Sequence, residues 1–228
     1  LLDLKHVAFY TIAFYIGSAI KVPTKSIIYI AVPLLAKAWE EQDFKQIKTI
    51  YSKSSINPLI VGGLFFLCVW INIDAIFSIL PEKFSDGKWV VFYIGLAQLF
   101  SVASGVNGAI IVNSKYYRYD LITNIILFWM TLYANWIFIP ESSPLSVYGV
   151  VGINGAAFAT ALSMFLFTLI RLVLIKIKMN LQPFSVKTVY SIGALLSIYI
   201  IISLLPQSSF ALVDIFWRSL LASIIFIC

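Results

Sequence analysis

Residues 151–177 read VGINGAAFATALSMFLFTLIRLVLIKI, and this stretch decides the class of fold. Its only charged side chains are Arg171 and Lys176, both near its end. An α-helix needs about 20 mainly apolar residues to cross the hydrocarbon core of a bilayer. The stretch is longer than that, so we expect it to be a transmembrane helix.

The rest of the chain has the same character. Of its 228 residues, 61% are hydrophobic and only 11% are charged, and the mean hydropathy is +0.96. Soluble domains have roughly 45–50% apolar and about 25% charged residues. We therefore expect an all-α, polytopic bundle of transmembrane helices that forms a single domain over residues 1–228. The formal charge of +6 does not indicate nucleic-acid binding, because the basic residues gather between apolar runs.

The apolar runs predict about seven membrane-spanning helices. They cover roughly residues 4–39, 57–80, 88–113, 121–139, 151–177 and 186–205, and a seventh run begins near Phe210. The sequence opens at Leu1 and closes at Cys228, inside or beside apolar runs. We therefore expect a fragment that is truncated at both ends.

One connection is long and polar, and it reads AWEEQDFKQIKTIYSKSS over residues 38–55. Apolar residues recur along it at helical spacing, at Trp39, Phe44, Ile47, Ile50 and Tyr51. This pattern predicts a separate amphipathic helix that lies on the membrane surface. A solvated connecting helix is an equally good interpretation.

The basic residues predict the orientation of the chain. The first, third and fifth connections carry ten of them: Lys37, Lys45, Lys48, Lys53, Lys115, Arg118, Arg171, Lys176, Lys178 and Lys187. The second connection carries Lys83 and Lys88, and the sixth holds none unless Arg218 is assigned to it. Short loops rich in Lys and Arg stay in the cytoplasm. The first, third and fifth connections are therefore predicted to be cytoplasmic.

The most informative polar residues are Lys21 and Lys25, inside the first apolar run. An ammonium group deep in a bilayer is costly, so it is expected to face the bundle interior or a water-filled cavity. Pro23 lies between the two lysines and removes a backbone hydrogen bond. Charge beside a broken helix is typical of transporter binding sites. The pair predicts a site for a phosphate or pyrophosphate group, although snorkelling to the interface or a re-entrant break would also explain it.

Two other sets of residues are candidates for the membrane interior. Ser101, Ser104 and Asn107 recur every three residues, which is compatible with cavity lining or with hydrogen bonds between helices. Small residues recur every four positions in the fifth apolar run, in the sets Gly152, Ala156, Thr160 and Gly155, Ala159, Ser163. Such spacing lets two helix backbones approach closely, so these residues are expected to pack against other helices.

The residue types that would support catalysis are sparse. The only histidine is His6, the two cysteines are far apart, and no buried carboxylate pair or phosphate-binding glycine loop is evident. We therefore expect neither an enzyme nor a metal or cofactor site.

Three stretches resemble the polysaccharide-biosynthesis flippases of the multidrug/oligosaccharidyl-lipid/polysaccharide exporter superfamily. They are residues 10–55 (YTIAFYIGSAIKVPTKSIIYIAVPLLAKAWEEQDFKQIKTIYSKSS), residues 95–128 (GLAQLFSVASGVNGAIIVNSKYYRYDLITNIILF) and residues 148–173 (YGVVGINGAAFATALSMFLFTLIRLV). The last stretch is the most specific, because its GAAFAT segment follows a YG turn as in the family.

The resemblance implies a two-lobed transporter with 12–14 spans, of which this chain would be the C-terminal half. It implies alternating access in the bacterial cytoplasmic (inner) membrane, with an N-terminal half of the same protein as partner. The implied substrate is a lipid-linked oligosaccharide with a pyrophosphate head group, such as an O-antigen precursor of lipopolysaccharide. Lys21 and Lys25 match the family's cavity cations by position. A multidrug or cation exporter of the superfamily, or a membrane subunit of a glycan-assembly enzyme, is the alternative.

Overall fold

The computed structural model describes residues 4–81, 87–205 and 211–227, and this part of the chain is helical without any strand. Lys83, Phe210 and Cys228, which entered the expectations above, lie outside it. The longer helices are α1 (Leu4–Ser18), α2 (Val22–Glu40), α3 (Phe44–Ile71), α5 (Lys88–Ala103), α7 (Arg118–Phe138), α8 (Gly152–Met179), α9 (Val186–Ser203) and α10 (Ala211–Ile227). The short elements are η1 (Ala19–Lys21), α4 (Ile73–Ile79), α6 (Asn107–Val112) and η3 (Ser146–Tyr148).

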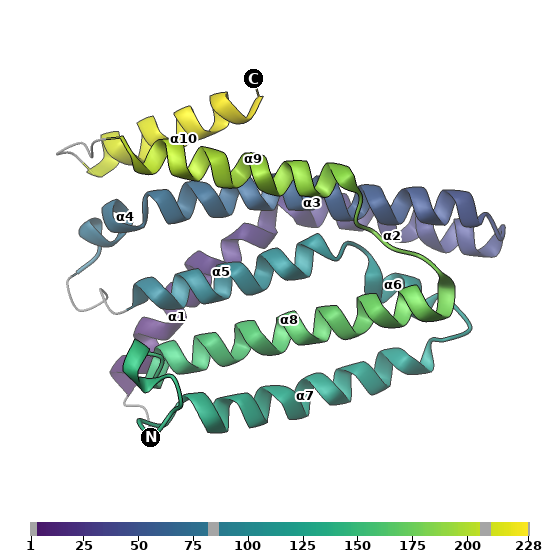
Figure 1. The fold of residues 1–228 in the computed structure, drawn as a ribbon, viewed down its shortest axis with the longest axis horizontal. Coiled ribbons are helices and arrows are strands. Elements are labelled where there is room, and N and C mark those ends of the chain that lie inside the picture. The colour runs from purple at the N-terminus through teal and green to yellow at the C-terminus, as the bar shows by residue number, and fades with distance from the viewer. Residues whose placement is uncertain (1–3, 82–86, 206–210, 228) are drawn as a thin grey trace.

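The long helices form one bundle with two layers. Figure 1 shows α7, α8, α5, α3 and α9 side by side in a row, with α1 and α2 crossing behind them. The packing follows this order: α8 lies between α7 and α5, and α3 contacts α2, α5 and α9. The helix ends gather at two poles, with the connection between α2 and α3 at one pole and η3 at the other.

Five helical segments in the described part are long and apolar enough to cross a membrane: Tyr10–Glu40, Phe44–Ile71, Arg118–Phe138, Gly152–Met179 and Val186–Ser203. The third and seventh expected spans correspond to shorter helices, because α5 has 16 residues and α10 has 17. The all-α fold and the multi-pass membrane character are therefore confirmed, whereas only five of the seven expected spans reach spanning length.

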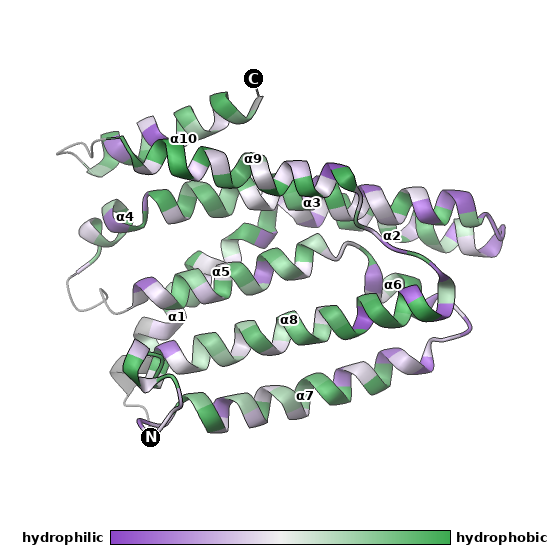
Figure 2. Cartoon of the chain, in the orientation of Figure 1, coloured by the Kyte–Doolittle hydropathy of each residue, from purple (hydrophilic) through white to green (hydrophobic). Residues whose placement is uncertain are grey.

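Helix α7 shows why this bundle belongs in lipid. Thr123 and Ala134 are its only buried residues, since it packs mainly on α8. Large apolar side chains such as Ile125, Phe128 and Trp136 are exposed along it. Figure 2 shows the same pattern, with hydrophobic residues along the middle of the long helices. A soluble protein rarely exposes such a continuous apolar surface, and lipid chains are the solvent that suits it.

The third expected span, residues 88–113, is wrong as one continuous helix. It is broken after Ala103 into α5 and the short helix α6. Gly105 lies in the break with φ +62°, and a Cβ atom there would lie 2.8 Å from Ser54 Oγ. Gly105 permits the break, because only glycine tolerates this backbone geometry at such close approach to α3.

The expected surface helix over residues 38–55 is also corrected. Helix α2 runs on to Glu40, and α3 is one continuous helix from Phe44 to Ile71, so no separate surface helix exists. Ile47 and Tyr51 are fully buried against Leu35 and Ile110 in a hydrophobic core. Ile47 and Tyr51 of the expected apolar face therefore pack against the protein itself, whereas Phe44 is 60% exposed.

Close packing of α8 on α7 centres on Gly155. A Cβ atom on this glycine would lie only 1.9 Å from the backbone carbonyl oxygen of Phe138. Gly155, Ala159 and Ser163 are buried, while Gly152, Ala156 and Thr160 are half-buried. The set Gly155, Ala159 and Ser163 therefore lies inside the bundle, and the other set lies at its edge.

We predict that Gly155→Ala lowers stability by about 1–3 kcal/mol, because α7 must shift to make room for the methyl group. Gly193→Ala is the matched control, since a Cβ atom on Gly193 of α9 meets no atom within 4 Å. The thermal unfolding midpoint in detergent measures both variants. Equal midpoints for the two variants would contradict the close approach of α7 and α8.

Candidate functional site

The break in the first membrane segment has a defined cause. Pro23 has no N–H to donate to the carbonyl of Ala19, four residues earlier. The N–H of Val22 donates to that carbonyl instead, which tightens residues 19–21 into the 3₁₀ turn η1. The hydroxyl of Thr24 donates to the carbonyl of Lys21 at 2.8 Å. The carbonyl that the proline leaves free is therefore satisfied by the backbone, and the Thr24 hydroxyl adds a further bond to the turn.

Lys21 and Lys25 flank this break. Lys21 is half-buried at the end of η1, and Lys25 is exposed in the first turns of α2. Within residues 4–81, 87–205 and 211–227, neither ammonium group forms an ion pair or a side-chain hydrogen bond. The two lysines lie four residues apart, about one helical turn, on either side of Pro23.

The polar set expected in the third span is divided by the helix break. Ser104 and Asn107 are buried on either side of Gly105, and Ser101 is half-buried. The hydroxyl of Ser104 donates to the carbonyl of Ser101 at 2.7 Å. No hydrogen bond of the described chain joins these three residues to Lys21 or Lys25. The helix break therefore separates Ser101 and Ser104 from Asn107, and their expected role in lining a cavity stays a prediction.

Two serines of α3 hold the broken helix in place. The hydroxyl of Ser55 donates to the carbonyl of Ala103 at the end of α5. The N–H of Val106, at the start of α6, donates to Ser54 Oγ at 3.3 Å. These bonds satisfy the polar groups that the break exposes. Residues 54–55 appeared in the sequence only as the end of a polar connection, which gave no signal for this role.

A buried ion pair links α7 to α8. Arg171 is only 7% exposed; its Nη2 pairs with the carboxylate of Asp120, and its Nε donates to Thr123 Oγ1 at 3.2 Å. The guanidinium group lies 4.3 Å from the ring centre of Phe167. A Cβ atom on Gly108 of α6 would lie 2.9 Å from it. Arg171 is thus a structural cation inside the bundle, and its assignment to a basic cytoplasmic connection is corrected.

Arg218 is a second buried cation that the sequence left ambiguous. It lies in α10, where its Nε donates to Asp214 at 3.2 Å and its Nη2 donates to the carbonyl of Leu205 at 3.0 Å. Both side chains of the pair are almost fully buried. The signal in the sequence was the four-residue spacing of an acid and a base on one helix.

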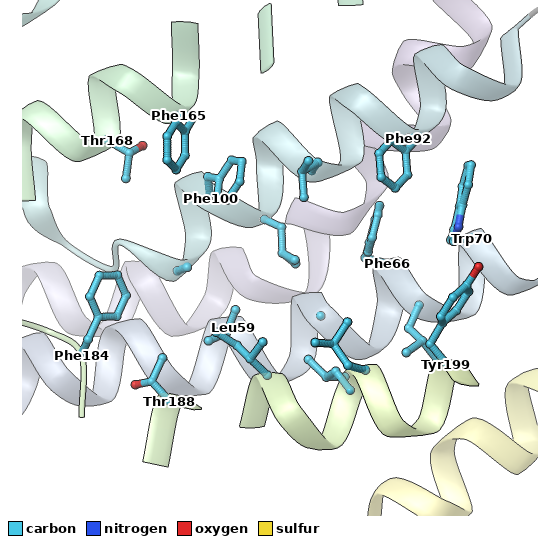
Figure 3. A pocket seen from close by; sticks show the side chains of 18 of the residues that line it. Leu59, Phe66, Trp70, Phe92, Phe100, Phe165, Thr168, Phe184, Thr188 and Tyr199 are labelled. Atoms are coloured by element: carbon cyan, nitrogen blue, oxygen red, sulfur yellow. The ribbon is translucent and has the colours of Figure 1, made fainter. Parts of the chain in front are cut away.

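An apolar groove of about 960 Å³ lies between α3, α5, α8 and α9. In Figure 3, Phe66, Trp70, Phe92 and Phe100 point into it from α3 and α5, and Tyr199 lies at one end. Neither lysine of the first segment lines it. Because the groove lies among membrane-spanning helices and is lined almost entirely by carbon, it suits a lipid chain and not a charged group.

The described part of the chain brings no three His, Cys, Asp or Glu side chains together as metal ligands. Comparison of the chain with models of known protein families, with curated protein sequences and with solved structures finds no match.

We predict that Arg171→Ala lowers the free energy of unfolding by about 3 kcal/mol, because it leaves Asp120 and Thr123 without their partner inside the bundle. This value is the lower end of the range for a broken buried pair, since the Asp120 side chain is 28% exposed. Unfolding by SDS in mixed micelles measures the change.

Lys88→Ala is the matched control for this variant. Its ion pair with Asp74 is well formed at 2.6 Å, but the two side chains are 36% and 63% exposed. An exposed pair contributes only about 0–1 kcal/mol. A similar loss of stability in both variants would show that burial does not distinguish the two pairs.

Proposed function

We propose that this chain is one lobe of a membrane transporter that carries an anionic, lipid-linked oligosaccharide across the cytoplasmic membrane of a bacterium by alternating access. The observation that supports the proposal is the pair of lysines at the break between α1 and α2. Lys21 is half-buried, Lys25 is exposed, and no described carboxylate pairs with either.

Among the cations that the described chain buries fully or in part, Lys21 alone has no acid partner, whereas exposed cations such as Lys53 and Lys178 have none either. Arg171, Arg218 and Lys88 each lie within ion-pairing distance of an aspartate. A lysine within the hydrocarbon region costs about 2.5–3.5 kcal/mol on insertion scales. Two cations without an internal partner therefore favour an external anion, and a pyrophosphate group offers several acceptor oxygens to two ammonium groups.

The sign of the charge separates the flippase from a cation exporter. A cation exporter needs a free carboxylate within the membrane, where it can bind its substrate or a proton. Asp74, Asp120 and Asp214 each have a basic partner in the structure. An anionic substrate is therefore the better match to the charges of the described chain.

The apolar groove supports the lipid-linked part of the proposal. A substrate with an isoprenoid or acyl chain must keep that chain in an apolar environment while its head group crosses the membrane. The groove between α3, α5, α8 and α9 offers such a surface. In this function the chain binds and moves its substrate and contributes no catalytic residue, metal or cofactor.

We predict that Lys21→Ala combined with Lys25→Ala lowers surface polysaccharide by about tenfold or more in complemented cells. A charge-assisted hydrogen bond to phosphate contributes roughly 1.5–3 kcal/mol, so losing two of them weakens substrate binding at least to that extent. Surface polysaccharide and membrane abundance are measured in parallel. The double Lys→Arg variant keeps both charges and is expected to retain most of the export.

Lys45→Ala combined with Lys48→Ala is the matched control, since it removes two exposed lysines from the start of α3. It is expected to leave export unchanged. Normal polysaccharide in the Lys21 and Lys25 double variant would refute the anion site. Loss of the protein from the membrane in that variant, with full abundance of the arginine variant, would instead assign the two lysines a structural role.

A further inference from the structure

A second, smaller cavity lies at the opposite pole from the basic connections. It has a volume of about 390 Å³ and is lined by Trp89, Tyr93, Tyr148, Gly149 and Asn154. These residues come from the start of α5, from the end of η3 and the residue after it, and from the start of α8, which meet at the pole opposite the α2–α3 connection in Figure 1. Ten basic residues were assigned to the cytoplasmic side; Arg171 is buried in the bundle, and the other nine lie towards the other pole. Because basic connections stay in the cytoplasm, this cavity faces the outer surface.

The aromatic rings of the cavity are held in position by their neighbours. The Trp89 ring centre lies 5.9 Å from those of both Trp70 and Phe92, and 6.2 Å from that of Tyr93. The Tyr93 ring meets the ring of Phe158 edge-on, at 5.4 Å and 80°. Trp89 is nevertheless half exposed, so one face of a packed ring is available to a ligand.

The polar group of the cavity has an unused acceptor. The Oδ1 atom of Asn154 is buried and has no hydrogen-bond partner in the structure. Its Nδ2 atom makes only a long contact of 3.5 Å with the carbonyl of Gly149. A buried acceptor without a donor is unfavourable, so a rotation of the Asn154 amide that turns Oδ1 towards the cavity would let a ligand hydroxyl donate to it. None of the five lining residues is charged.

We propose that this cavity binds an uncharged pyranose unit of a glycan on the outer side of the membrane. The C–H face of a pyranose ring is slightly positive and packs on the negative face of an aromatic ring. The hydroxyl groups of the sugar then donate to Asn154. The volume lies within the range of roughly 300–1,000 Å³ that small-molecule sites occupy.

Trp89 makes this assignment more specific, because it lines both the sugar cavity and the apolar groove. A ligand with a sugar next to a lipid chain would therefore contact both faces of one aromatic cluster. The inference rests on the proposed function and deepens it, since it assigns a place on the outer side to the sugar part of the substrate. The alternative is that Trp89 only anchors α5 at the membrane interface. That role would not explain the cavity beside its ring or the unpaired acceptor of Asn154.

Saturation-transfer NMR on the protein in phosphatidylcholine nanodiscs, free of sugar-based detergent, tests the site. The probes are maltotriose and chitotriose, two uncharged trisaccharides, with glycerol as a polyhydroxyl compound that lacks a pyranose face. We expect transfer to the trisaccharides and none to glycerol. Trp89→Ala and Asn154→Ala are each expected to weaken binding roughly 2- to 12-fold, the equivalent of one aromatic contact or one hydrogen bond.

Trp136→Ala is the matched control. Trp136 is also an exposed tryptophan, 74% accessible near the end of α7, but it lines neither cavity. It is expected to leave the transfer unchanged, and Trp89→Phe, which keeps a ring, is expected to retain most of it. No transfer from the wild-type protein to either trisaccharide, or an equal loss in Trp89→Ala and Trp136→Ala, would overturn the sugar site.

The result is distinguishable from the test of the proposed function. Export that depends on Lys21 and Lys25, without saturation transfer to sugars, would overturn the sugar site and leave the flippase proposal standing. Saturation transfer that depends on Trp89, with export unaffected by the two lysines, would support the sugar site and overturn the anion-binding mechanism.

Discussion

Lipid offers no hydrogen-bonding partners, so each backbone amide and carbonyl group in the membrane needs a partner from the protein itself. A continuous helix meets this need without help, and a broken helix does not. Two breaks in the described helices, at η1 and between α5 and α6, show how this need is met. At η1 the N–H of Val22 and the hydroxyl of Thr24 supply the missing bonds. Between α5 and α6 the hydroxyl groups of Ser54 and Ser55 do so from a neighbouring helix.

The two breaks differ in what surrounds them. The break between α5 and α6 is buried, closed by Gly105 against α3, and carries no charge. The break at η1 carries two lysines and no described acid to neutralise them. Buried cations elsewhere are paired with aspartates, as Arg171 and Arg218 are. The lysines at η1 are therefore the basis of the proposed anion site, whereas the ion pairs of Arg171 and Arg218 are structural.

Three separate surfaces of the described chain differ in their chemistry. The groove offers an almost entirely apolar lining, the small cavity offers aromatic rings and an amide, and the lysines offer positive charge. Trp89 joins the first two of these surfaces. A molecule that combines a lipid chain, an anionic linker and uncharged sugars would meet a suitable surface for each part as it crosses the membrane.

The sequence by itself determined the class of fold, because long apolar runs can only be buried in lipid and only helices satisfy their backbone there. It also located the proline break and the lysines beside it, since both effects are local. The tertiary structure alone decided which polar residues are paired. Arg171 looked like a loop cation, but Asp120, 51 positions away, makes it a buried structural residue. Ser54 and Ser55 looked like surface polar residues. Because α3 approaches closely at Gly105, their hydroxyl groups instead hydrogen-bond to the backbone on either side of the break between α5 and α6. These roles depend on contacts between distant segments, and hydrophobic periodicity carries no information about such contacts.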